Sequence, residues 1–289
     1  MDRRDLLKGM LAGAAALGLS PSLLLAGTDD ANARLAALER QYGGRLGVAI
    51  LDTANGSRAS YRADERFLLC STFKMLLAAA VLARVDRGTE QLDKRLEFGK
   101  DAVVDHSPVT SLHIGPPGMS IAELCKAAVS VTDNTAANVL LKHLGGPHVI
   151  TDLARQLGDP LTRLDRYEVE LNRPAPDGVS DTTTPNAMLG NLQKLLLGNG
   201  LSEASRKQLT EWMLGAVTGQ KLVRAGVPAG WKIAEKTGGG NFQTNDVAIL
   251  WPPGRKPLLA AVYYENAARD IDERSAVLAS VGRIMAAIM

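Results

Sequence analysis

Cysteine, aromatic residues and net charge are all scarce in this sequence of 289 residues. Two cysteines are too few for a disulfide scaffold. Aromatic residues make up 4% of the chain, and 33 lysines and arginines against 31 aspartates and glutamates leave a formal charge of only +2. Nucleic-acid binding uses a basic surface and stacking rings, so we expect no nucleic-acid partner.

Histidine is also rare, and the four histidines show no spacing typical of a metal site. The chain contains neither a His-Glu-x-x-His nor a Cys-x-x-Cys sequence, so we expect no bound metal. What is present is typical of a globular protein, with 46% hydrophobic and 22% charged residues. The length fits one large domain or two interleaved ones.

The first thirty residues have the features of an export signal. Residues 3–8 read Arg-Arg-Asp-Leu-Leu-Lys, and residues 9–28 form an uncharged stretch rich in Ala, Gly and Leu. A basic start before a modest apolar run is typical of a secretory signal, and the paired arginines resemble a twin-arginine signal. We therefore predict that residues 1–30 are such a signal, cleaved after Ala26 or Ala33. An uncleaved membrane anchor is the alternative, which a proline and four glycines disfavour.

Strand patterns lie near both ends of the remaining chain, and helical patterns lie between them. Two strand-like runs surround an Asn-Gly turn early in the chain, which is a hairpin signal, and three more strand-like runs come late. The strand runs are residues 46–51, 58–62, 231–237, 246–251 and 258–264. The helical patterns are residues 32–42, 68–157, 185–197, 203–214 and 271–289. This order predicts one sheet built from both ends of the chain, with a helical domain inserted between them.

The first motif with a chemical meaning is Ser71-Thr72-Phe73-Lys74. Lys74 is the only charged residue between Arg66 and Arg84, so the helix that carries it is expected to be buried. Three residues apart on a helix, Ser71 and Lys74 share one face, where an amine can activate a hydroxyl as a nucleophile. A lone Ser-x-x-Lys equally fits a capping serine followed by a lysine that extends to water.

Two further motifs carry polar groups with functional and structural interpretations. Thr132-Asp133-Asn134 lies between apolar helical runs, where it either caps a helix or supplies a proton-relaying hydroxyl and an amide for substrate. Glu235-Lys236-Thr237-Gly238-Gly239 ends a strand in glycines. Such an edge either forms an exposed turn or lets an anionic ligand approach the backbone closely.

A Pro/Gly-bearing loop from residue 166 to residue 181 shows neither helix nor strand periodicity. It fits a compact Ω-loop that carries Glu168 and Asn172, and Arg166 and Asp181 at its two ends would pair across its neck. An ordinary surface loop is the alternative.

The four motifs in this order resemble the class A serine β-lactamases over essentially the whole chain after the signal. The resemblance implies hydrolysis of the β-lactam ring of penicillins and cephalosporins through a serine acyl-enzyme, which confers resistance. It also implies an α/β fold: a five-stranded antiparallel sheet flanked by N- and C-terminal helices, with an inserted, mostly helical domain. The boundaries implied are residues 31–66 and 217–289 for the α/β domain and 67–216 for the helical domain.

The resemblance assigns a catalytic role to four side chains. Ser71 would attack the lactam carbonyl, Lys74 would share protons with Ser71 and Glu168, and Thr132 would relay a proton. Glu168, positioned with Asn172, would activate the water that releases the acyl group. Whether Lys74 or Glu168 is the base for acylation is left open by the resemblance.

Substrate binding would fall to a second set of residues. The backbone N–H groups of Ser71 and Gly239 would form the oxyanion hole, and Asn134 would hold the amide side chain of the substrate. The strand edge Lys236-Thr237-Gly238 would face the substrate carboxylate, and His106 would flank the entrance. No metal or organic cofactor is implied.

The sequence departs from the family pattern at three places. Threonine stands at position 132 where the family usually has serine, and His106 stands where Tyr or Trp is common. Many relatives carry an arginine near the carboxylate pocket, but the matching positions here are Leu222, Ser275 and residues 243–245. Lys236 and Thr237 would then hold the carboxylate alone.

The two cysteines match family cysteines whose disulfide partners are absent. The partner position of Cys70 is occupied by Gly239 and Gly240, and that of Cys125 by Ala78. We therefore predict two buried, free thiols.

Two other activities share some of the same motifs. A D-alanyl-D-alanine carboxypeptidase would also use Ser-x-x-Lys and Lys-Thr-Gly but would lack the loop with Glu168 and Asn172. A β-lactam sensor would stay acylated and would be tethered to a transmembrane transducer. We expect an exported monomer, periplasmic or secreted, that binds a small β-lactam and has no stable membrane association after processing.

Overall fold

The computed structural model of the chain describes residues 21–288, with side chains from residue 30 onward. The predicted signal over residues 1–30 therefore lies mostly outside the described residues. Within the described range, no helix combines the length and apolar character needed to cross a bilayer.

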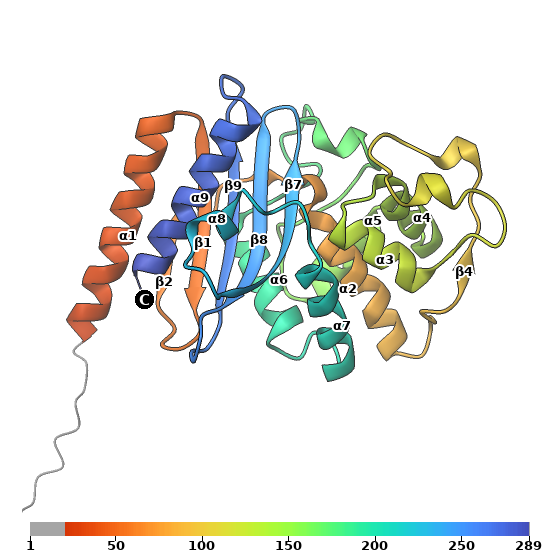
Figure 1. The fold of residues 1–289 in the computed structure, drawn as a ribbon, viewed down its shortest axis with the longest axis horizontal. Helices are drawn as coiled ribbons and strands as arrows, with labels where there is room; N and C mark the ends of the chain where they lie inside the picture. The colour runs from red at the N-terminus through yellow and green to blue at the C-terminus, as the bar shows by residue number, and fades with distance from the viewer. Residues whose placement is uncertain (1–20, 289) are drawn as a thin grey trace, which may run out of the picture.

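A five-stranded sheet connects the two ends of the chain. Its strand order is β2-β1-β9-β8-β7, with every neighbouring pair antiparallel (Figure 1). The strands are β1 (Arg45–Asp52), β2 (Arg58–Tyr61), β7 (Lys232–Gly239), β8 (Gln243–Trp251) and β9 (Leu258–Glu265). The predicted α/β fold with a five-stranded antiparallel sheet is confirmed.

The central strands are apolar on both faces because each face covers a different core. In β9, Leu258, Ala260, Val262 and Tyr264 enter one core, whereas Leu259, Ala261 and Tyr263 enter the other. This alternation follows from the period of two in a strand, and it explains why these segments are continuous apolar runs.

One face of the sheet packs against the N- and C-terminal helices, and the other faces the mostly helical part (Figure 1). The first set comprises α1 (Pro21–Tyr42), α8 (Val223–Gly226) and α9 (Ile271–Ala287). The second set comprises α2 (Phe73–Asp86), α3 (Ile121–Ser130), α4 (Asn134–Leu144), α5 (His148–Gln156), α6 (Pro185–Leu196) and α7 (Glu203–Leu214). Two two-residue strand pairs, β3 (Phe67–Leu68) with β6 (Thr182–Thr183) and β4 (Arg95–Leu96) with β5 (Met119–Ser120), complete the fold. The domain boundaries given above stay predictions.

Three element boundaries differ from the sequence prediction. Helix α1 begins at Pro21 rather than residue 32, because the alanines and leucines before residue 32 favour helix and a proline is tolerated in a first turn. Strand β7 continues through Gly239, and β8 begins at Gln243 rather than residue 246. Gly239 pairs with Thr244, since ladder pairing uses only the backbone.

Candidate active site

Ser71 lies in a single 3₁₀ turn, Cys70–Thr72, directly before helix α2. N–H groups in a first turn have no partner within the helix, so the Ser71 amide can donate to an external oxygen. Strand β7 passes close to this turn: a Cβ at Gly238 would lie 3.1 Å from the Leu69 carbonyl oxygen and 3.2 Å from Cβ of Cys70. Glycine at 238 therefore lets the strand edge approach the serine.

Lys74, one turn along α2, is completely buried and forms polar contacts with four other residues. Its Nζ lies 3.0 Å from Ser71 Oγ and 3.0 Å from Glu168 Oε1. The same Nζ donates to the Thr132 carbonyl at 2.8 Å and to Asn134 Oδ1 at 2.5 Å. The amine is thus placed between the hydroxyl and the carboxylate.

Burial lowers the pKa of Lys74, and the nearby Glu168 carboxylate opposes that shift. Removal from water disfavours the ammonium form, whereas an adjacent negative charge favours it. An amine whose protonation is balanced in this way is suited to accept and return a proton.

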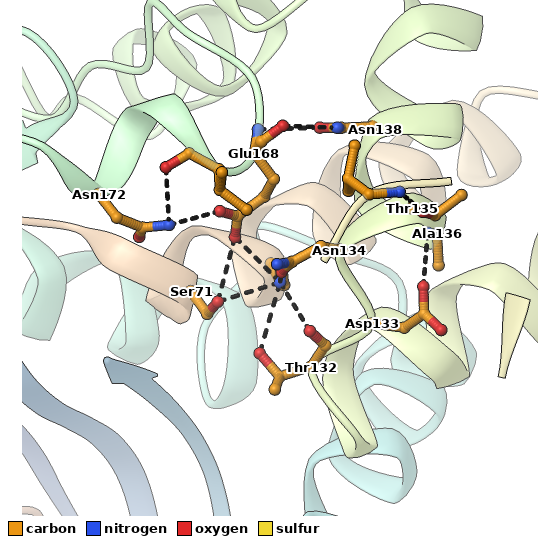
Figure 2. A network of polar contacts seen from close by, with 12 residues as sticks. Ser71, Thr132, Asp133, Asn134, Thr135, Ala136, Asn138, Glu168 and Asn172 are labelled. Atoms are coloured by element: carbon orange, nitrogen blue, oxygen red, sulfur yellow. Dashed lines mark hydrogen bonds and ion pairs between the residues drawn. The ribbon is translucent and has the colours of Figure 1, made fainter. Parts of the chain in front are cut away.

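Glu168 is aimed at Ser71 by contacts to both its side chain and its backbone (Figure 2). Ser71 Oγ lies 3.2 Å from Glu168 Oε1, and Asn172 Nδ2 donates to Glu168 Oε2 at 2.6 Å. Asn138 holds the backbone, accepting from Glu168 N–H at 3.0 Å and donating to its carbonyl at 2.9 Å. The loop is thereby anchored at its functional residue.

Asn138 was missed in the sequence analysis, although a signal for it was present. It follows Asn134 by four residues on α4, so both lie on the helix face that carries the Thr-Asp-Asn motif. A second amide at this spacing marks that face as polar in an otherwise apolar helix.

Asp133 is the structural member of its motif. It caps α4 by accepting from Ala136 N–H at 2.8 Å, and its other oxygen accepts from the N–H groups of Val109 and Thr110, each at 3.0 Å. This fully buried carboxylate ties the loop before α3 to the start of α4. The capping interpretation therefore holds for Asp133, whereas Thr132 and Asn134 contact Lys74.

Thr132 lies beside Lys74 in an uncommon backbone conformation. Its φ of 57° is unfavourable for a β-branched residue. The conformation directs its carbonyl to Lys74 Nζ and leaves its hydroxyl 3.4 Å from the same atom. Threonine at this position therefore keeps the hydroxyl next to the amine.

Arg166 and Asp181 lie together at the neck of the Ω-loop. Arg166 Nε is 2.5 Å from Asp181 Oδ2, and Asp181 Oδ1 accepts from Arg166 N–H at 3.0 Å. The Asp181 carbonyl also accepts from Leu69 N–H at 2.9 Å, two residues before Ser71. The pair closes the loop and joins it to the segment that carries the serine.

A cleft of about 640 Å³ opens beside Ser71. Its wall includes Thr132 and most of the residues singled out from the sequence for binding: His106, Asn134, Asn172, Thr237, Gly238 and Gly239. His106 contributes at the entrance, and its backbone carbonyl accepts from Asn134 N–H at 3.0 Å. The far wall is formed by residues 217–222 and the first residues of α9.

Lys236 does not reach the wall of this cleft. It is completely buried, and its Nζ donates to the Thr237 carbonyl at 2.8 Å. Burial and the charge of Lys74 lower its pKa well below the usual range. The Thr237 hydroxyl does lie on the wall, 2.5 Å from the hydroxyl of Thr218.

Both cysteines are free and buried, as predicted. Burial raises the pKa of each thiol far above its ordinary value, so both remain protonated and unreactive.

Comparison with known proteins identifies relatives along most of the chain. A model of the Beta-lactamase enzyme family matches residues 30–289. Beta-lactamase OXY-1 of Klebsiella oxytoca is 44% identical over 277 residues, covering 96% of this chain and 95% of that relative. The carbapenem-hydrolyzing beta-lactamase KPC of Klebsiella oxytoca is 45% identical over 251 residues, covering 86% and 85%. The solved structure of an ancestral (GNCA) class A β-lactamase is 56% identical, with a TM-score of 0.85, and covers 88% of this chain and 98% of that one.

Proposed function

This chain belongs to the class A serine β-lactamases and hydrolyses β-lactams, and on that basis we propose that Ser71 is its nucleophile and Glu168 the residue that activates water. One observation carries the proposal. The Ser71 hydroxyl lies within hydrogen-bond distance of both Lys74 Nζ and Glu168 Oε1. A nucleophile that donates to a carboxylate and accepts from an amine one helical turn away has the geometry that covalent catalysis requires.

In the proposed acylation step, Ser71 Oγ attacks the lactam carbonyl while its proton passes to Lys74 or, through Lys74, to Glu168. The N–H groups of Ser71 and Gly239 stabilise the developing oxyanion. The ring C–N bond then breaks, and the ring nitrogen takes a proton through Lys74 and the Thr132 hydroxyl. Asn134, Thr237 and Gly238, which line the cleft, orient the substrate.

In the proposed deacylation step, Glu168 takes a proton from a water that attacks the acyl ester. Asn172 supports this role, because its Nδ2 fixes Glu168 Oε2 while its buried Oδ1 has no partner among the described residues. That oxygen suits a water held between the two side chains. The ester breaks, and Ser71 regains its proton.

The first thirty residues are proposed to direct export of the folded enzyme to the periplasm or the medium, where it acts as a monomer. The adjacent Arg3 and Arg4 and the apolar stretch after them support this assignment. Fractionation of cells that produce the Arg3→Lys/Arg4→Lys protein tests it: the enzyme should then stay in the cytoplasm.

Replacing Glu168 with alanine tests the catalytic assignment. The variant should acylate with a chromogenic cephalosporin but release product about 10³-fold more slowly, because general-base catalysis contributes about 10²–10⁴-fold. Intact-protein mass spectrometry should then show one acyl group on Ser71. Glu170→Ala, two residues along the same loop, is the matched control and should keep parental turnover. Parental turnover by Glu168→Ala would contradict the role given to this carboxylate.

A further inference from the structure

A buried arginine lies next to the cleft without a carboxylate partner. Arg274, in the first turn of α9, is 5% exposed, and it forms no ion pair within the described part of the chain. Its Nε donates to Thr244 Oγ1 at 3.1 Å, and its NH1 group donates to the Arg269 carbonyl at 2.6 Å. Buried charges are normally paired, so this guanidinium projects an uncompensated positive potential.

The only side-chain acceptor of Arg274 among the described residues lies on the wall of the cleft. Thr244 is opposite Gly239 in the β7–β8 register, so it adjoins the strand edge that carries Thr237. A hydroxyl that accepts from a guanidinium keeps its own hydrogen for another acceptor, and the accepted bond polarises it. No other side-chain hydrogen bond of Thr244 is present among the described residues.

The other cations near this end of the cleft are less suited to hold an anion. Lys236 is completely buried and donates to a backbone carbonyl. Lys221 lies on the wall, but its Nζ is 2.7 Å from Asp272 Oδ1, and the two side chains are 73% and 70% exposed. An ion pair in water is screened and already neutralised. The neighbouring Ser275 hydroxyl donates to the Ile271 carbonyl of its own helix.

We propose that Arg274 is a positioning residue for the carboxylate of the β-lactam substrate, acting through the hydroxyl of Thr244. The inference rests on the proposed function. It assigns a source of positive charge at a place where the arginine positions common in relatives hold Leu222, Ser275 and residues 243–245. The buried guanidinium orients and polarises Thr244, and Thr244 donates to the carboxylate beside Thr237.

The test pairs enzyme variants with two forms of one substrate. A chromogenic cephalosporin with its free carboxylate is compared with the same compound as the primary carboxamide. Arg274→Gln and Thr244→Val should each lower kcat/KM for the acid about tenfold through KM, with kcat within twofold, the loss expected for one charge-assisted hydrogen bond. The carboxamide should lose less than twofold. Arg274→Lys should recover part of the acid's kcat/KM.

Lys207→Gln, which removes an exposed lysine outside the cleft, is the matched control and should change kcat/KM for the acid less than twofold. Lys221→Gln tests the competing cation on the wall and should also have little effect, because Asp272 already neutralises it. Should Arg274→Gln fail to fold, Thr244→Val decides, since threonine and valine have the same shape. Equal losses for acid and carboxamide would show a merely structural role and overturn the inference. A tenfold loss in Lys221→Gln with none in Thr244→Val would overturn it in favour of Lys221. Both of these results would overturn only the role of Arg274, because the parent protein would still hydrolyse the cephalosporin. A parent protein that hydrolyses neither the acid nor the carboxamide would contradict the proposed function itself.

Discussion

The two ends of the cleft hold charge in opposite ways. At the serine end, Lys74 and Glu168 are both buried and lie 3.0 Å apart, so each compensates the other directly. At the far end, Arg274 is buried without a counter-ion among the described residues, and the Lys221–Asp272 pair is exposed to solvent. A proton can pass between Lys74 and Glu168 without leaving an unpaired charge in the interior, whereas the unpaired guanidinium of Arg274 favours binding of an anion such as a carboxylate. The first end is therefore suited to chemistry and the second to binding.

This difference separates the kinetic constants that each end should control. Changes at the serine end should lower kcat, because they alter groups that we propose act on the reacting atoms. Changes at the arginine end should act on KM for substrates with a carboxylate. Variants at the serine end should therefore give the largest losses of activity, and they test whether kcat and KM are controlled by different ends of the cleft.

The largest effect should come from Lys74→Met. Methionine fills much of the same volume but can neither accept a proton from Ser71 nor hold Glu168 by charge. We expect kcat/KM to fall by about 10³-fold or more, within the range of general acid–base catalysis. Stopped-flow measurement of the acylation burst checks the result.

The control for this change is Lys126→Met, which removes an exposed lysine from the neighbouring helix α3. It should keep parental kinetics. A Lys74→Met protein that loses only substrate affinity would break the division between the two ends.

A smaller effect on kcat should follow from Asn138→Ala. The amide of Asn138 binds both the N–H and the carbonyl of Glu168, so its loss frees the backbone that aims the carboxylate. We expect kcat to fall about 10–100-fold, as for loss of a supporting contact to a catalytic group. Accumulated acyl-enzyme in quenched reactions locates the defect in deacylation.

Asn191→Ala separates this effect from simple loss of stability. Asn191, on α6, is also buried, but it hydrogen-bonds to Asp159 in the loop after α5, and neither residue lines the cleft. Both variants should lower the free energy of unfolding, and only Asn138→Ala should lower kcat. An equal loss of kcat in both would assign Asn138 a purely structural role.

The smallest effect concerns stability and pH, and it arises behind the strand edge. Burial and the nearby Glu235 raise the pKa of Asp246 well above its ordinary value of 3.8. The folded state keeps this proton after the unfolded chain has released it, so the free energy of unfolding falls as the pH rises above 3.8. Asp246→Asn has no such proton, so its free energy of unfolding should fall less than that of the parent protein between pH 5 and pH 8.

Urea unfolding at both pH values measures this difference. The exposed Asp93→Asn serves as the control and should follow the parent protein. Parallel pH dependence in Asp246→Asn and the parent would show that this carboxyl is ionised in the folded state.

The sequence predicted the sheet and the serine end of the cleft because their signals are local. Apolar runs bounded by turns marked the strands, and short motifs marked Ser71, Lys74, Thr132 and Lys236. The boundaries of β7 and β8 were missed, because glycines and polar residues join a ladder through their backbones alone.

The arginine end could not be predicted in the same way. The contact between Arg274 and Thr244 joins residues 30 positions apart through the packing of α9 on β8. Helical periodicity indicates which face of a helix is buried, but it does not say which side chain on another element a given residue will contact. The left-handed backbone conformation of Thr132 could not be predicted either, because β-branched residues such as threonine rarely adopt a positive φ.

The pairing of β1 with β9 has a consequence for the order of events during synthesis. Strand β1, residues 45–52, can pair with β9 only after residues 258–265 have been synthesised, and α9 is synthesised later still. The centre of the sheet therefore cannot form before then. Contacts this distant in sequence slow folding, because a long loop must be closed before they form. A nascent or truncated chain that stops before residue 258 has Ser71, Lys74 and Glu168 but lacks the strand that joins the sheet's two halves. The sheet that supports these side chains can therefore close only after nearly the whole polypeptide has been made.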